Sequence, residues 1–323
     1  MLKIARRQLG RNGPEVSCIG CGAIVLPFGN GEEEEEEDKR FKIYNRAIEF
    51  GCNFFDSGDI YGDSEDSFRK YFQKYPNQRD KMFLATKFGL VFSPESKSYT
   101  VRGDAQYVYE ACEKSLKRLG INSIDLYYIH CKIKYIGLSN CSSNTLQRAY
   151  LIHPISCVQI EYSPFNREIE NEQNNLLKTC RQLGVTIVCY SPLSRGILGG
   201  NIQCLNDLRT NDFRRQFPRF FEENLMKNVE LTEKLRKLSE KKGCTLSQLT
   251  LAWIVAQGDD FIPIPSTTNI QHLEENLVSN QIQLNQEELN EIRHICQHSQ
   301  IAGESCPTNM LHFLFADSAS KTD

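Results

Sequence analysis

The feature that most constrains the fold is a regular alternation of short apolar segments with longer amphipathic ones. The short segments are apolar on both faces, as strands are in a parallel sheet that helices cover on its outer side. The longer segments have the apolar spacing of helices, and several end at a glycine suited to a helix C-terminus. The pattern predicts strands at 16–24, 52–57, 82–89, 124–131, 134–140, 156–163, 185–193 and 261–267, with helices at 40–50, 64–75, 105–119, 143–152, 172–183 and 226–241.

Eight strands joined through helices predict an α/β fold of the (β/α)8 TIM barrel type. Ahead of the first strand, Asn12-Gly13 lies between two short polar-apolar runs and predicts a β-hairpin. We expect one barrel domain over residues 1–315. The last residues, 316–323, are small and polar, and we expect them to be a disordered tail.

One connection does not fit a regular barrel. The segments IDLYYIH and KIKYIGLSN are almost contiguous, whereas parallel neighbours need a crossover of about a dozen residues. Four extended residues reach at most ~17 Å, which leaves no length for a turn and a helix. The sequence therefore predicts a barrel in which one crossover helix, the fourth, is absent.

Composition excludes several classes of function. Lys and Arg number 38 against 41 Asp and Glu, and no basic stripe is present, so a nucleic-acid partner is not expected. No apolar stretch approaches the ~20 residues of a membrane helix, and the N-terminus has no secretion signal. The thirteen cysteines are scattered singly, as buried thiols are in a reducing compartment. We expect the protein to be cytoplasmic. The sequence does not indicate its oligomeric state.

Polar side chains gather where the predicted strands end, which is where barrel enzymes place their active sites. Asp56, Tyr61, Lys87 and His130 follow successive strands. A phenol is a weak acid with a pKa near 10, and a neighbouring ammonium held by a carboxylate is expected to lower that pKa. Each of these residues alone has an ordinary structural explanation. Together they suit protonation of a substrate oxygen.

The segments NFFDSGDIYG, FLATKFG and DLYYIH resemble signature segments of the aldo-keto reductase superfamily. The likeness continues through KYIGLSN, VQIEYS, YSPLSRGILGG and IPIPSTTNIQHLEENL, in order and over nearly the whole chain. The resemblance implies a (β/α)8 barrel that reduces aldehydes or ketones to alcohols. It also implies NADP(H) as the cofactor. No Lys or Arg stands near Asn269, Gln271 or His272 to pair with a 2′-phosphate, which keeps NAD(H) open.

The resemblance also assigns roles to residues. It makes Tyr61 the general acid, Lys87 and Asp56 the pair that tunes it, and His130 the residue that orients the carbonyl. Asp56 also counts among the cofactor-contacting positions. The other expected cofactor contacts are Gly22 and Ala23 at the first strand, Ser139, Asn140, Gln159 and Tyr190 at the nicotinamide, Ser191, Leu193, Arg195, Gly196 and Leu198 at the pyrophosphate, and Ser266, Thr267, Thr268, Gln271, Glu275 and Asn276 at the adenosine phosphate.

Other interpretations stay open. The same scaffold can serve a catalytically impaired cofactor-binding or regulatory protein, since a fold does not dictate function. The short connection after His130 can also come from a skipped exon or a faulty gene model. A barrel hydrolase using Asp56 and Glu161 leaves Lys87 and Tyr61 unexplained. A metal site is not expected, because His130 alone among six histidines follows a predicted strand.

Overall fold

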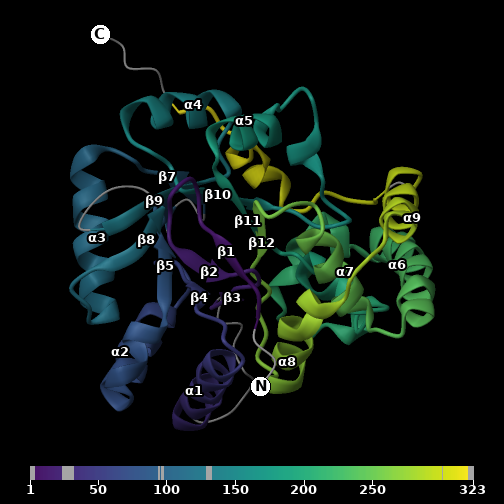
Figure 1. Ribbon diagram of the computed structural model, residues 1–323, viewed down its shortest axis with the longest axis horizontal. Coiled ribbons are helices and arrows are strands. Elements are labelled where there is room, and N and C mark those ends of the chain that lie inside the picture. Colours follow the sequence, from purple (N-terminus) through teal and green to yellow (C-terminus); the bar gives the residue numbers. More distant parts are fainter. Residues whose placement is uncertain are drawn as a thin grey trace.

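The computed structural model describes residues 4–23, 33–93, 95, 98–128, 133–299 and 301–318 of the 323-residue chain. Its centre is a parallel sheet of eight strands in the order β12-β11-β10-β9-β8-β5-β4-β3 (Figure 1). This confirms the predicted α/β class and its eight parallel strands. The strands of this sheet are β3 (Cys21–Gly22), β4 (Phe54–Asp56), β5 (Phe83–Lys87), β8 (Ile124–Tyr128), β9 (Ile133–Ser139), β10 (Cys157–Glu161), β11 (Thr186–Tyr190) and β12 (Phe261–Pro263).

The sheet curls so that its two outer strands meet. Gly20 N donates a hydrogen bond to Pro263 O at 2.9 Å, and Gly22 N donates to Pro265 O at 3.0 Å. A Cβ on Gly22 would lie 2.9 Å from the carbonyl oxygen of Ile264, so only glycine allows this approach. The sheet is therefore barrel-like, and Gly22 meets a packing requirement at its seam. The expected contact of Gly22 with a cofactor stays a prediction.

Helices surround the sheet (Figure 1). The predicted glycines at helix ends, Gly51, Gly120, Gly184 and Gly243, all have positive φ. The helices at 105–119 and 143–152 begin and end where predicted, because Asp104 and Ser142 cap their first turns. The helices are α1 (Glu33–Glu49), α2 (Ser64–Lys74), α3 (Ala105–Leu119), α4 (Ser143–Ile152), α5 (Leu176–Leu183), α6 (Glu222–Lys242), α7 (Leu246–Val255), α8 (Ile270–Val278) and α9 (Gln286–Gln297). None of them, within the described residues, is both long and apolar enough to span a bilayer.

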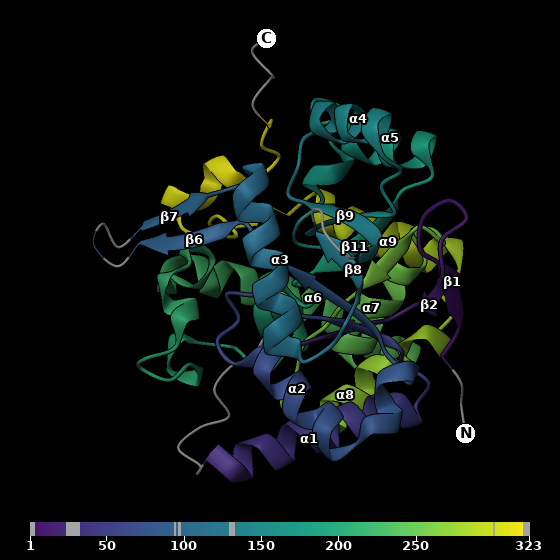
Figure 2. The same cartoon turned by 90° about the vertical axis from the view of Figure 1, so that its left-hand side faces the viewer.

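Two hairpins accompany the sheet. The predicted one pairs β1 (Arg6–Gln8) with β2 (Glu15–Ser17), and its Leu9 and Val16 are fully buried among side chains of the sheet's interior. A second hairpin, β6 (Leu90–Ser93) with β7 (Ser98–Val101), was not predicted. Figure 2 shows the two hairpins on opposite sides of the sheet. The first therefore closes the end of the sheet away from β6 and β7.

The link between β8 and β9 is short. The two strands are parallel neighbours, with Tyr128 opposite Gly137, yet β8 ends at Tyr128 and β9 begins at Ile133. Residues 129–132, including His130, lie outside the described part of the chain. The predicted absence of a crossover helix here stays a prediction, which we take up below.

The C-terminal segment corrects another expectation. Ala316 pairs with Cys141 just after β9, and Ser318 N donates a hydrogen bond to Thr145 Oγ1 at 2.8 Å on α4. Asp317 accepts a hydrogen bond from Ser142, the residue that caps α4. Residues 316–318 are thus held by hydrogen bonds that a composition argument does not reveal, and the prediction of disorder was wrong for them. Residues 319–323 lie outside the described residues.

The interior of the sheet gives a test of packing. A Cβ on Gly137 would lie 2.7 Å from the Tyr128 ring and 2.9 Å from Cys157 Sγ. We predict that Gly137→Ala lowers the free energy of unfolding by about 1–3 kcal/mol in urea denaturation, because the ring has no room to move. Gly103→Ala, where nothing lies within 4 Å, is the control and should change it by less than about 0.5 kcal/mol. Equal changes in the free energy of unfolding for the two variants would contradict the tight packing around Gly137.

Candidate functional site

The core of the candidate site is an ion pair at the carboxyl ends of β4 and β5. Lys87 Nζ donates to Asp56 Oδ1 at 2.5 Å and to the carbonyl of Ser57 at 2.6 Å. The Asp56 side chain is 3% exposed and the Lys87 side chain 15%. Burial by itself lowers the pKa of Lys87, but the Asp56 carboxylate and Tyr61 outweigh it and raise the pKa above its ordinary value. Lys87 is therefore a fixed cation.

A buried amide extends this pair to the opposite side of the sheet. Gln159 Nε2, on β10, donates to Asp56 Oδ2 at 2.7 Å and to the Tyr128 hydroxyl at 2.8 Å. Gln159 and Tyr128 are almost inaccessible to solvent. Sequence reasoning predicted Gln159 as a cofactor contact and missed Tyr128. The alternation of strand side chains was the available signal, since Tyr128 shares a face of β8 with Leu126, which is also in the sheet's interior.

Tyr61 lies beside this ion pair, in the turn between β4 and α2. Lys87 Nζ is 4.8 Å from the centroid of the Tyr61 ring. Burial raises the pKa of the Tyr61 phenol, and Asp56 raises it further, whereas the Lys87 ammonium and a hydrogen bond from it lower it; the net pKa is above the ordinary value. Lys87 thus lowers the pKa of the phenol as expected, but the loss of hydration outweighs this one cation.

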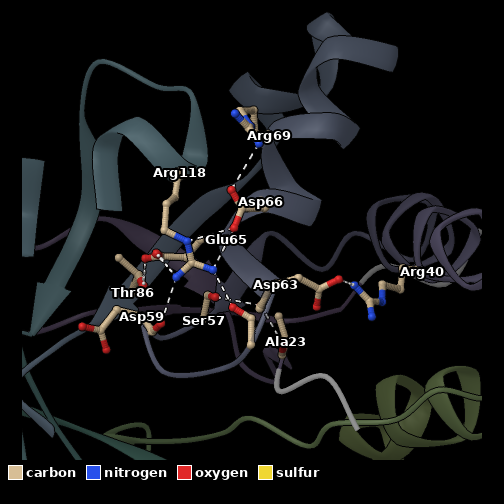
Figure 3. Close-up of polar contacts among 12 residues, drawn as sticks. Ala23, Arg40, Ser57, Asp59, Asp63, Glu65, Asp66, Arg69, Thr86 and Arg118 are labelled. Atoms are coloured by element: carbon tan, nitrogen blue, oxygen red, sulfur yellow. Dashed lines mark hydrogen bonds and ion pairs between the residues drawn. The ribbon is translucent and has the colours of Figure 1, made fainter. Parts of the chain in front are cut away.

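The turn that carries Tyr61 adjoins a charged network, drawn in Figure 3. Arg118 of α3 contacts Glu65 and Asp66 of α2 and the main chain of the turn. Asp59 belongs to the same turn, and burial raises the pKa of its carboxyl to about 6, with a further contribution from Glu65. This network was not predicted from the sequence, because its partners come from separate helices.

Asn140 and Tyr190 meet at the ends of β9 and β11. The Tyr190 hydroxyl donates to Asn140 Oδ1 at 3.2 Å, and Asn140 N donates to the carbonyl of Gln159 at 3.0 Å. Asn140 has a φ of 51°, a conformation that asparagine tolerates better than most residues. Ser139 is exposed next to them. The structure thus brings the four predicted nicotinamide contacts to neighbouring strand ends, with Gln159 tied to Asp56.

The segment after β11 is a tight loop of left-handed backbone. Ser191, Ser194 and Arg195 have φ near 50°, and Gly196 has a φ of 104°. Arg195 reaches back to Glu161 at the end of β10, with 3.3 Å between Nη1 and Oε2. Backbone of this kind turns successive N–H groups to one side, which suits an anion. Leu193 is half-buried in this loop, whereas Leu198 is fully buried and packs in the core.

The remaining predicted contacts lie at the start of α8. Asn269 caps this helix by accepting from the backbone N–H groups of Gln271 and His272. Ser266, Thr268 and Gln271 are exposed and Thr267 is half-buried. Asn276 is buried, and Glu275 accepts a hydrogen bond from Thr245, so these two also serve the packing of α8.

Ala23 and His130 complete the predicted set. Ala23 N donates to Asp56 O at 2.7 Å, which fixes the end of β3 beside β4. His130 lies outside the described residues. Both carboxylates of the hydrolase interpretation are engaged in ion pairs, Asp56 with Lys87 and Glu161 with Arg195 and Arg219. No group of three or more candidate metal ligands occurs among the described residues.

Comparison with known proteins gives consistent matches. The model of the aldo/keto reductase family matches residues 19–131 and 132–297. An NADP(+) aldo-keto reductase of Schizosaccharomyces pombe, yakc, is 38% identical over 339 residues, covering 98% of each chain. Aldo-keto reductase str7 of Strobilurus tenacellus is 41% identical, covering 94% of this chain and 95% of that protein. The crystal structure of the thermostable aldo-keto reductase Tm1743 with the inhibitor epalrestat has a TM-score of 0.67 and 25% identity, covering 90% of this chain and all of the other.

The raised pKa of Asp59 gives a test of the turn's electrostatics. The folded pKa of about 6 exceeds the unfolded value near 4, so ionised Asp59 destabilises the fold above pH 6 and the penalty vanishes as the pH falls toward 4. We predict that Asp59→Asn raises the free energy of unfolding by about 1–2 kcal/mol at pH 7.5, after allowance for solvent screening, and far less at pH 4.5. Chemical denaturation at both pH values measures this.

The exposed Asp80 supplies the control for this measurement. Asp80→Asn should change the free energy of unfolding by less than about 0.5 kcal/mol at either pH. A gain for Asp59→Asn that is the same at pH 4.5 and 7.5 would show that burial of the ionised carboxylate is not its cause.

Proposed function

The chain belongs to the aldo/keto reductase family, and from that premise we propose that it is an NADP(H)-dependent oxidoreductase that reduces an aldehyde or ketone to an alcohol. The observation that carries the proposal is the buried Lys87–Asp56 ion pair with the Tyr61 phenol beside it. NAD(H) is the alternative cofactor, since no cation stands at 269–272. A location in the cytoplasm stays an expectation from the sequence, which does not indicate the oligomeric state.

The residues present fit a cofactor that carries a pyrophosphate and a carboxamide. Asn140 and Gln159 offer amide groups at adjacent strand ends, and Tyr190 offers an aromatic ring next to Asn140. The left-handed loop at 191–196 bears Arg195, whose charge suits a pyrophosphate. The cofactor, when bound, supplies the hydride. Ser139, Ser191, Leu193, Gly196 and the exposed residues at the start of α8 are the further contacts that we propose.

The chain's own residues then supply the proton. In our proposal Tyr61 donates its phenolic proton to the carbonyl oxygen as negative charge develops there. Lys87 stabilises the phenolate that remains, and Asp56 holds Lys87 at that place. In this proposal His130 orients the carbonyl of the substrate. Because the pKa of Tyr61 is raised in the protein alone, Tyr61 stays protonated throughout the neutral range and is ready to donate.

We also propose that this barrel lacks a crossover segment between β8 and β9 that its relatives have. Three observations support this. Only residues 129–132 separate the two strands, and the family match falls into two stretches that meet between residues 131 and 132. The alignment with the Schizosaccharomyces pombe relative spans 339 residues, more than the 323 of this chain, so gaps fall in this chain.

The short link favours a second candidate function. Because His130 stands in it, the chain can bind cofactor yet turn over poorly, as a regulatory cofactor-binding protein would. Turnover of a reactive aldehyde with NADPH separates the two candidates. Cofactor binding without any oxidation of NADPH would favour the second one.

Replacing the proton donor tests the main proposal. We predict that Tyr61→Phe lowers the turnover number about 10²–10⁴-fold and leaves the dissociation constant of NADPH unchanged, because proton transfer and cofactor binding use different groups. Steady-state kinetics and a fluorescence titration measure the two quantities. Tyr150→Phe, on the outer helix α4, is the matched control and should retain full activity. Full activity in Tyr61→Phe would refute the role of Tyr61.

A further inference from the structure

The turn that presents Tyr61 belongs to no helix or strand and is held at few points. Tyr61 N donates to Gly58 O at 3.0 Å, and Tyr61 O accepts from Ser64 N at 3.0 Å. Asp59 N donates to Lys87 O at 2.9 Å, which fixes the start of the turn to β5. These bonds define the local shape of the turn, and Asp59 gives it one attachment to the neighbouring strand. At the end of the turn, Arg40 Nη1 of α1 donates to Asp63 Oδ2 at 2.6 Å (Figure 3).

Arg118 provides a further attachment from outside the turn, to its main chain. Its Nη1 donates to the carbonyl of Asp59 at 2.8 Å, and its Nη2 donates to the carbonyl of Gly62 at 2.5 Å. These two carbonyls lie on either side of Tyr61 in the chain. Arg118 comes from α3, so the turn is tied to a helix that begins more than forty residues further on. Figure 3 shows the guanidinium between the turn and α2.

Arg118 is itself held in one orientation. Glu65 Oε2 accepts from Nη1 at 3.0 Å, and Asp66 Oδ2 accepts from Nε at 2.9 Å and lies 2.9 Å from Nη2. The five N–H groups of a guanidinium are thereby matched by five contacts. Glu65 is fully buried, and its other oxygen accepts from Thr86 of β5 at 2.8 Å. The residue after Thr86 is Lys87, so the network and the ion pair share a strand.

We propose that Arg118, anchored by Glu65 and Asp66, is a positioning residue that fixes the turn and so holds the Tyr61 phenol beside Lys87. The inference rests on the proposed role of Tyr61 as proton donor. A donor displaced by 1 Å can lose about 100-fold in rate, so a turn with few attachments needs such a clamp. Arg118 contacts no residue proposed to hold the cofactor.

Lysine cannot reproduce the clamp, because an ammonium has three donors and no planar fork. We expect Arg118→Lys to lower the turnover number about 10- to 100-fold while the dissociation constant of NADPH stays unchanged. Arg69→Lys is the matched control. Arg69 also binds Asp66, at 3.2 Å, but has no hydrogen bond to the turn, and its replacement should leave turnover unchanged. Circular dichroism and a thermal melt establish that each variant is folded.

A double-mutant cycle with Tyr61→Phe separates positioning from a general loss of structure. If Arg118 acts through Tyr61, adding Arg118→Lys to Tyr61→Phe should not lower the residual single-turnover rate further. An equal loss in both backgrounds would overturn the proposal, as would wild-type turnover in Arg118→Lys. If Tyr61→Phe alone retains full activity, the proposed function fails, and this outcome is distinct from failure of the clamp.

Asp66→Asn provides a milder variant if Arg118→Lys does not fold. It weakens the anchor of Arg118 at a half-buried position and leaves the guanidinium in place. Turnover should fall by a smaller factor than in Arg118→Lys, again with NADPH binding unchanged and again only when Tyr61 is present. A fall that persists in the Tyr61→Phe background would contradict the clamp.

Discussion

The buried ion pair between Lys87 and Asp56 is the interaction on which the site depends. Two charges so far from water are stable only when each is paired and its remaining hydrogen-bonding capacity is met. The carbonyl of Ser57 accepts a further hydrogen bond from Lys87, and the amide of Gln159 donates one to Asp56. Because these groups come from β4, β5 and β10, the pair joins strands on different sides of the curled sheet. Loss of either partner leaves an unpaired buried charge, which typically costs about 3–5 kcal/mol.

The same burial sets the electrostatics of the proposed donor. Loss of hydration raises the pKa of Tyr61, so Lys87 does not make the phenol a stronger acid than in water. It limits the rise and, in the mechanism that we propose, stabilises the phenolate that forms when the proton leaves. A fixed cation in a site with little water acts on the developing charge without reorganising, which is how preorganised sites lower barriers. Such stabilisation requires accurate placement of the phenol, and this is the task that we assign to Arg118.

Much of the fold could be predicted from sequence because it follows from local patterns. Apolar runs, helix spacing and terminal glycines predicted the strands of the sheet and the bounds of α3 and α4, and successive strand ends predicted Asp56 and Lys87 together. What failed depends on contacts distant in the chain. The docking of 316–318 on α4 and the Arg118 network each need partners that no local pattern pairs, whereas the alternation along β8 gave a signal for the inward Tyr128 that was not used. The pKa of Tyr61 was predicted in part, because Lys87 lowers it as expected, whereas burial, which depends on the whole barrel, raises it more.

We propose that a cofactor site assembles although four residues join β8 to β9. A thermal melt of the 323-residue chain with and without saturating NADPH, and with NADH for comparison, tests it most directly. A ligand at a hundred times its dissociation constant adds about 2.7 kcal/mol to the stability of the folded state. We predict one sharp transition that NADPH moves to higher temperature. A broad transition that neither cofactor moves would contradict the claim.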